Sequence, residues 1–320
     1  MLVALTLLVL VEAGLHLAGT APAYDVGRFG VWRFTANLRA EPLRGPRDGH
    51  AFVVSTNAGG LRTQVPTART PGRCRIALLG DSTVFGWGVD DGATVADAAE
   101  AALAPAAEVL NAGQPGYTTV MAATLFSEAV AAYQPDVTVL FVPMHDTNFA
   151  LVSDLEARRG AADLPAWLRV TLNRHSRIYA LLRRALTPDG DAPFVVPVHT
   201  ASGDTPTDRS RVPRVSDVER TTVLGDMRAA AAAWGGSVHL GYLPFAQDVQ
   251  PGPHPRVLDG WMLENAGPPG VADLRSSAVG QTDFVLSDDE GHLSANGNRV
   301  TGEALAAWLR IRAGACLGAL

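Results

Sequence analysis

The chain has 320 residues, of which 47% are hydrophobic and 18% are charged, so a largely disordered protein is excluded. It contains 26 basic residues, all of them arginine, against 32 acidic ones, which gives a formal net charge of −6. Because no basic run is present, we do not expect nucleic acid as a partner. The length predicts one or two domains with a core large enough to be stable without metals or disulfides.

The first 23 residues have the character of a targeting segment. Residues 1–11 form a nearly unbroken apolar run that Glu12 interrupts, and Ala21-Pro22-Ala23 has the small-x-small form of a cleavage site. The basic residues that usually precede such a run are missing. We predict a signal peptide or membrane anchor over residues 1–23, with a buried first helix of the globular domain as the alternative.

Residues 24–73 are rich in Gly, Pro and Arg, and we interpret them as an irregular N-terminal lead with a few short strands. The cysteine count excludes a disulfide scaffold and a four-cysteine zinc site. One bridge between Cys74 and Cys316 stays open, although two cysteines this far apart in sequence are expected to be unpaired.

From residue 74 onward, short apolar runs alternate with helical patterns, which is typical of a parallel sheet covered by helices. We expect strands at residues 75–80, 108–111, 136–144, 237–243 and 271–274, and helices at 94–103, 118–133, 215–234 and 294–312. The predicted fold is a flavodoxin-like three-layer α/β/α sandwich with a five-stranded, doubly wound parallel sheet. The predicted domain spans residues 74–315.

An insertion at about residues 149–215 interrupts this alternation. It contains a basic amphipathic pattern within residues 165–186 and then a stretch rich in Pro, Gly, Ser, Thr and Asp. We interpret the basic helix as a solvated face, with binding to a membrane as the alternative.

In doubly wound sheets the active site lies at the carboxyl ends of the strands. Ser82 follows the first predicted strand and is the candidate nucleophile, while His292 is the candidate base. Asp289 stands three residues before His292, so the two side chains share a face if the loop makes a helical turn. Asp288 is the weaker alternative, and Asp81 is interpreted as a carboxylate that caps the loop.

The backbone N–H groups of Ser82 and Gly116 are candidate donors to an oxyanion, since glycine permits a close approach of the backbone. The histidines at positions 50, 199, 239 and 254 lack ligand spacing, so neither a metal nor another cofactor is predicted.

With these features the sequence resembles the SGNH/GDSL hydrolase family over roughly residues 74–312. GDST at residues 80–83 is similar to the family's nucleophile block, NAGQPGYTT at 111–119 to its glycine block, and DEGHLSANGNRV at 289–300 to its Asp-x-x-His block. The resemblance implies the roles already suggested for Ser82, Gly116, Asp289 and His292. Residues 55–62 are similar to the lead of bacterial envelope members that carry an N-terminal membrane segment.

One block departs from the family pattern. Where the family has Gly-x-Asn-Asp and the Asn donates to the oxyanion, this sequence has Pro143-Met144-His145-Asp146. An imidazole N–H can also donate a hydrogen bond, so His145 is a candidate replacement, and a structural histidine is the equal alternative. Asn148 is a second candidate for the donor.

These features predict an exported serine esterase that hydrolyses carboxylic esters through an acyl-enzyme, on an envelope carbohydrate or lipid. The expected partners are a small-molecule or glycan ester and, through residues 1–23, a bacterial membrane; the location is membrane-anchored, periplasmic or extracellular. Two alternatives use the same fold: O-acyl transfer to a glycan or metabolite, and carbohydrate binding without catalysis.

Overall fold

The structure is a computed structural model. It describes residues 2–18, 24–26, 31–44, 50–150, 152–160, 172, 176–186, 212–268, 270–287, 289 and 291–318.

A five-stranded sheet forms the centre of the molecule, in the order β11-β10-β7-β5-β6 with every neighbouring pair parallel. The strands are β5 (Cys74–Gly80), β6 (Ala107–Gly113), β7 (Val137–Phe141), β10 (Ser237–Tyr242) and β11 (Ala272–Asp273). Every residue of β5, β6 and β7 is buried, as expected for strands covered on both faces. The predicted architecture is therefore confirmed, with its strand order reversing beside β5.

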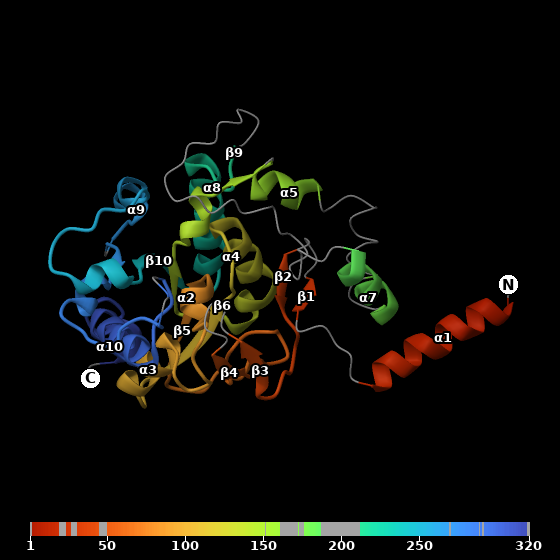
Figure 1. The fold of residues 1–320 in the computed structure, drawn as a ribbon. Helices are drawn as coiled ribbons and strands as arrows, with labels where there is room; N and C mark the ends of the chain where they lie inside the picture. Colours follow the sequence, from red (N-terminus) through yellow and green to blue (C-terminus); the bar gives the residue numbers. More distant parts are fainter. Residues whose placement is uncertain are drawn as a thin grey trace.

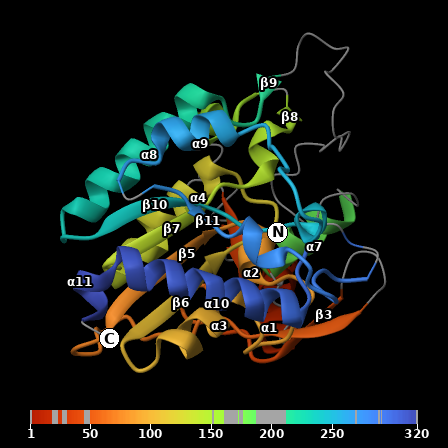
Figure 2. The ribbon, with the colours of Figure 1, turned by 90° about the vertical axis from the view of Figure 1, so that its left-hand side faces the viewer.

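Helices cover both faces of this sheet (Figures 1 and 2). One face packs against α3 (Val95–Leu103) and α10 (Ala295–Arg312), and the other against α4 (Thr119–Leu125) and α8 (Asp217–Ala232). Along β5, Ile76 and Leu78 enter the core beneath the first pair, whereas Ala77 and Leu79 enter the core beneath the second. The two apolar cores follow directly from the alternation of side chains along a strand.

Shorter elements complete the chain. They are α2 (Ser82–Phe85), α9 (Asp259–Asn265), α11 (Gly314–Leu317), and the 3₁₀ turns η3 (Met144–Thr147), η4 (Ala246–Val249) and η5 (Arg275–Ala278). The helix predicted over residues 118–133 is α-helical only to Leu125. It continues as the π-helix η1 (Phe126–Val130) and the 3₁₀ turn η2 (Ala131–Tyr133).

The N-terminal lead is more ordered than its composition suggests. It contains two antiparallel pairs, β1 (Tyr24–Val26) with β2 (Trp32–Phe34) and β3 (Glu41–Arg44) with β4 (Ala51–Val54). Trp32, Phe34 and Phe52 are buried in the same apolar core as α4 and α8. Because these aromatic side chains complete that core, the lead is built into the sandwich.

The first helix, α1 (Leu2–Leu17), extends away from the sandwich and lies beside α7 (Arg177–Leu186) (Figure 1). Its apolar residues 7–11 are more than half exposed. Glu12 accepts hydrogen bonds from the Arg177 and Ile178 backbone N–H groups at the start of α7. None of the described helices is both long enough and apolar enough to cross a membrane.

Part of the insertion is also described. It includes α5 (Asp154–Gly160) and the short antiparallel pair β8 (Phe149–Ala150) and β9 (Val212–Pro213). The second half of the predicted basic helix forms α7, whereas residues 161–171 and 173–175 and the following loop at 187–211 lie outside the described residues.

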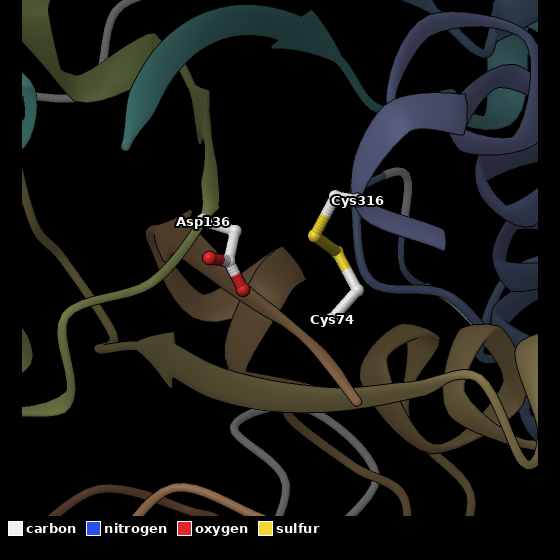
Figure 3. A group of neighbouring side chains, drawn as sticks. All are labelled: Cys74, Asp136 and Cys316. Atoms are coloured by element: carbon white, nitrogen blue, oxygen red, sulfur yellow. A yellow bond between two sulfur atoms is a disulfide. The ribbon is translucent and has the colours of Figure 1, made fainter. Parts of the chain in front are cut away.

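A disulfide joins Cys74 to Cys316, so the expectation of unpaired cysteines is wrong (Figure 3). Cys74 begins β5 and Cys316 lies in α11, and the fold brings their Cα atoms to 5.3 Å across a sequence separation of 242 residues. Such proximity cannot be inferred from sequence spacing. The Asp136 carboxylate lies beside the bridge, but the bonded sulfurs offer no thiolate to a metal.

The disulfide is expected to stabilise the fold by restricting the unfolded chain. We predict that Cys74→Ala combined with Cys316→Ala lowers the free energy of unfolding by about 2–4 kcal/mol. Urea denaturation of the oxidised parent and of the double variant measures this difference. A parent whose denaturation midpoint is unchanged by reductant would contradict it.

Candidate active site

Ser82 is the first residue of α2 and follows the carboxyl end of β5. Asp81 caps this helix, because its Oδ1 accepts hydrogen bonds from the Thr83 backbone N–H at 3.0 Å and from the Thr83 hydroxyl at 2.8 Å. Gly113, at the end of β6, allows α2 to pack closely, since a Cβ there would lie 2.2 Å from the Phe85 nitrogen. These contacts fix the turn that presents the Ser82 hydroxyl.

The Ser82 hydroxyl, the His292 imidazole and the Asp289 carboxylate form one hydrogen-bonded chain. Ser82 Oγ donates to His292 Nε2 at 2.8 Å, and His292 Nδ1 donates to Asp289 Oδ2 at 2.7 Å. The other carboxylate oxygen, Oδ1, accepts the backbone N–H groups of Gly291 and His292 at 2.8 and 3.0 Å. The structure thus brings together the three residues named as a triad, while Asp288 lies outside the described residues.

The Asp289 carboxylate is held in its ionised form. Burial raises its pKa, but the hydrogen bonds from the His292 ring, the Gly291 N–H and the His292 N–H outweigh burial and lower the pKa below its usual value. An ionised Asp289 keeps the proton of His292 on Nδ1, which leaves Nε2 free to accept the Ser82 proton. The arrangement can therefore convert a neutral hydroxyl into a nucleophile.

Two backbone N–H groups at the carboxyl edge of the sheet have no hydrogen-bond partner within the described part of the chain. They belong to Ser82 itself and to Gly116, whose φ of 72° places it in the left-handed region. Ser82 follows β5 and Gly116 follows the neighbouring strand β6, so the two predicted donors lie at the same edge of the sheet. Free N–H groups in this position can stabilise a developing oxyanion.

His145 comes from η3, which follows β7 on the other side of β5. Its Nε2 lies 4.0 Å from Asp81 Oδ2, and its Nδ1 accepts a hydrogen bond from the Asn148 side-chain amide at 3.3 Å. Burial lowers the pKa of His145 below its usual value, despite the nearby Asp81 carboxylate. His145 therefore faces the turn that carries Ser82, which we call the nucleophile turn. The Asn148 amide donates its hydrogen bond to the imidazole.

Asp146, next to His145, is fully buried and anchors this turn. Its carboxylate accepts the Thr119 N–H and hydroxyl, both at 2.7 Å, and pairs with Arg220 of α8 at 2.7 Å. Burial raises the pKa of Asp146, and its hydrogen bonds to Arg220 and Thr119 counteract that rise. The turn that carries His145 is thereby fixed to both α4 and α8.

Side chains that flank Gly116 bind the N-terminal lead, a connection that the sequence motifs did not indicate. Gln114 accepts the Phe34 N–H and donates to the Gly60 carbonyl, each at 3.2 Å. Tyr117 donates to the Trp32 carbonyl, and its burial raises the pKa of its hydroxyl far above the usual range. The lead therefore holds the loop that carries Gly116.

Arg62, also in the lead, clamps the segment that follows Ser82. Its Nη1 donates to the Phe85 and Gly86 carbonyls at 3.1 and 2.8 Å, and its Nη2 donates to the Val89 carbonyl at 2.7 Å. Its Nε pairs with Asp91 at 3.1 Å. Only the planar, forked guanidinium can satisfy so many acceptors from one point.

Replacing Arg62 is expected to loosen the nucleophile turn. We predict that Arg62→Met leaves buried carbonyls unsatisfied and lowers the free energy of unfolding by about 3 kcal/mol. Arg62→Lys keeps the charge but not the fork, so it should recover only part of that loss. Thermal denaturation of both variants measures the effect, and equal stability of Arg62→Lys and the parent would contradict the proposed clamp.

The fold and the site together define a three-layer α/β/α protein whose sheet carries a Ser-His-Asp chain at its carboxyl edge. No family model and no curated protein matches the sequence. Solved structures do match. One, from Desulfitobacterium hafniense DCB-2, is described as a lipolytic protein of the G-D-S-L family; it is 12% identical, with a TM-score of 0.41, over 73% of this chain and 99% of that one.

Two further structures are similar over comparable lengths. A lipase/acylhydrolase from Enterococcus faecalis is 16% identical over 75% of this chain and 96% of its own, with a TM-score of 0.42. LAE5, an α/β hydrolase enzyme from the metagenome of Lake Arreo in Spain, is 17% identical over 77% of this chain and 97% of its own, with a TM-score of 0.43.

Proposed function

We propose that this protein is a serine esterase that hydrolyses carboxylic esters through an acyl-enzyme. The proposal rests on one observation: the 2.8 Å contact between Ser82 Oγ and His292 Nε2, continued by the 2.7 Å contact from His292 Nδ1 to Asp289. A serine hydroxyl needs a base within hydrogen-bond reach, and that base needs a group that orients it. Both requirements are met here.

In the proposed reaction, Ser82 Oγ attacks the ester carbonyl carbon while its proton passes to His292 Nε2. The carbonyl oxygen becomes an oxyanion that the Ser82 and Gly116 N–H groups and His145 stabilise. The tetrahedral intermediate collapses, and His292 gives its proton to the departing alcohol oxygen. Water then attacks the acyl-enzyme with His292 again as base, which releases the carboxylic acid and restores Ser82.

The nucleophile is tested by removing its hydroxyl. We predict that Ser82→Ala lowers kcat for p-nitrophenyl acetate by at least about 10⁴-fold and abolishes labelling by a fluorophosphonate. Ser276→Ala, at an exposed serine of η5, is the matched control and should retain both activities. A parent protein that neither hydrolyses short acyl esters nor is labelled would refute the esterase proposal.

We further propose that the protein is exported, and that its ester substrate is an envelope carbohydrate or lipid. Two features support export: the apolar, exposed residues of α1 and the Cys74–Cys316 disulfide, since disulfides persist in oxidising compartments.

Export is tested by fractionating a bacterium that expresses the full chain. We predict that the protein appears in the membrane, periplasmic or extracellular fraction with both cysteines resistant to alkylation under non-reducing conditions. A cytosolic product with two alkylated cysteines would refute export without affecting the esterase proposal.

A further inference from the structure

The contact between Asn148 and His145 determines where the imidazole proton lies. The Asn148 side-chain amide donates to His145 Nδ1 at 3.3 Å, and the Asn148 backbone N–H donates to the His145 carbonyl at 3.2 Å. A neutral imidazole carries one proton, and a ring nitrogen that accepts a hydrogen bond cannot carry it. The proton of a neutral His145 is therefore on Nε2.

The Nε2–H group faces the nucleophile turn and is unused. Its nearest carboxylate oxygen, Asp81 Oδ2, lies 4.0 Å away, which is too long for a hydrogen bond. Among the described residues this nitrogen makes no hydrogen bond. Asp81 directly precedes Ser82, so the free N–H belongs to the same edge of the sheet as the free Ser82 and Gly116 N–H groups.

We propose that Asn148 is a positioning residue that holds His145 in the Nε2–H tautomer, so that His145 supplies a third donor to the oxyanion. The inference rests on the proposed esterase function. It also gives different roles to the two residues that the sequence offered as side-chain donors to the oxyanion. His145 contacts the reacting oxygen, and Asn148 acts through His145.

The tautomer of His145 decides which ring nitrogen can donate only if the ring is neutral. Burial lowers its pKa, and the charged groups that face it are Asp81 and Asp146, which raise the pKa, and Arg214 and His292, which lower it. The resulting pKa is below the usual value, so the ring is neutral over the range in which esterases are assayed. An imidazolium would donate from both nitrogens whatever its neighbour, whereas a neutral ring donates only from the nitrogen that its neighbour leaves protonated.

Asn148→Asp reverses the polarity of the contact. The new carboxylate accepts a hydrogen bond from a protonated Nδ1 and raises the pKa of His145. Below the raised pKa the imidazolium still donates through Nε2; above it, the remaining proton stays on Nδ1 and a bare Nε2 lone pair faces the oxyanion. We expect kcat of Asn148→Asp to fall with rising pH by about 100-fold, the effect of losing one oxyanion donor, with little change in KM.

The matched control is Thr147→Asp, which adds the same charge one residue earlier, at a side chain whose hydroxyl donates to the Met144 carbonyl and does not contact the imidazole. Thr147→Asp should keep the pH profile of the parent. If the profiles of Asn148→Asp and Thr147→Asp coincide, Asn148 has no role in positioning the proton, and the inference is overturned.

Substitutions of His145 test the donor itself. His145→Phe keeps a planar ring without a donor and should lower kcat by about 100-fold, whereas His145→Gln offers an amide N–H and should recover most of it. In the His145→Gln background, Asn148→Asp should no longer produce the fall with pH. A His145→Phe variant as active as the parent would overturn the inference.

A readout without catalysis separates this inference from the proposed function. In the Ser82→Ala protein, ¹⁵N NMR of the His145 ring should show a protonated Nε2 and an unprotonated Nδ1. The opposite tautomer overturns the inference and leaves the esterase proposal intact. A parent protein that hydrolyses no ester refutes the esterase proposal and, with it, the oxyanion role of His145.

Discussion

The hydrogen bond between Ser82 Oγ and His292 Nε2 is the contact on which the proposed chemistry depends. It joins residues 210 positions apart, one on the turn after the central strand β5 and one on the loop before α10. A parallel sheet makes such a meeting possible because all its strands end at one edge, and three neighbouring strands, β6, β5 and β7, deliver Gly116, Ser82 and His145 there. The loop that carries Asp289 and His292 lies at the same edge, where His292 contacts Ser82.

The N-terminal lead belongs to this site as much as the sheet does. Its aromatic residues fill one of the two cores, while Arg62 binds the carbonyls behind Ser82 and the backbone near Phe34 binds Gln114. Three contacts of different kinds thus tie the lead to the nucleophile turn and to the Gly116 loop. Buried polar groups of the lead and of these loops therefore satisfy one another.

Most of the fold could be predicted from the sequence because local patterns of apolar and polar residues indicate its strands and helices. The buried strands are short apolar runs, and the Asp289–His292 spacing is a local turn. What the sequence did not reveal depends on contacts between distant segments. The pairing of Cys74 with Cys316, the role of Arg62 and the burial of Phe34 all follow from which elements the sandwich places side by side. The sequence motif at residues 143–146 could be interpreted only in part. Residue types gave both His145 and Asn148 as candidate donors, and only the geometry distinguishes them.

The disulfide also determines what happens to the chain when it is cut. In sequence, Ser82 follows Cys74 and His292 precedes Cys316, so a cut in the insertion leaves Ser82 on the piece that carries Cys74 and His292 on the piece that carries Cys316. A protease that severs the backbone anywhere in the insertion leaves two polypeptides that are still covalently joined at the start of β5. Nicked molecules therefore keep Ser82 and His292 in one covalently joined particle until the disulfide is reduced.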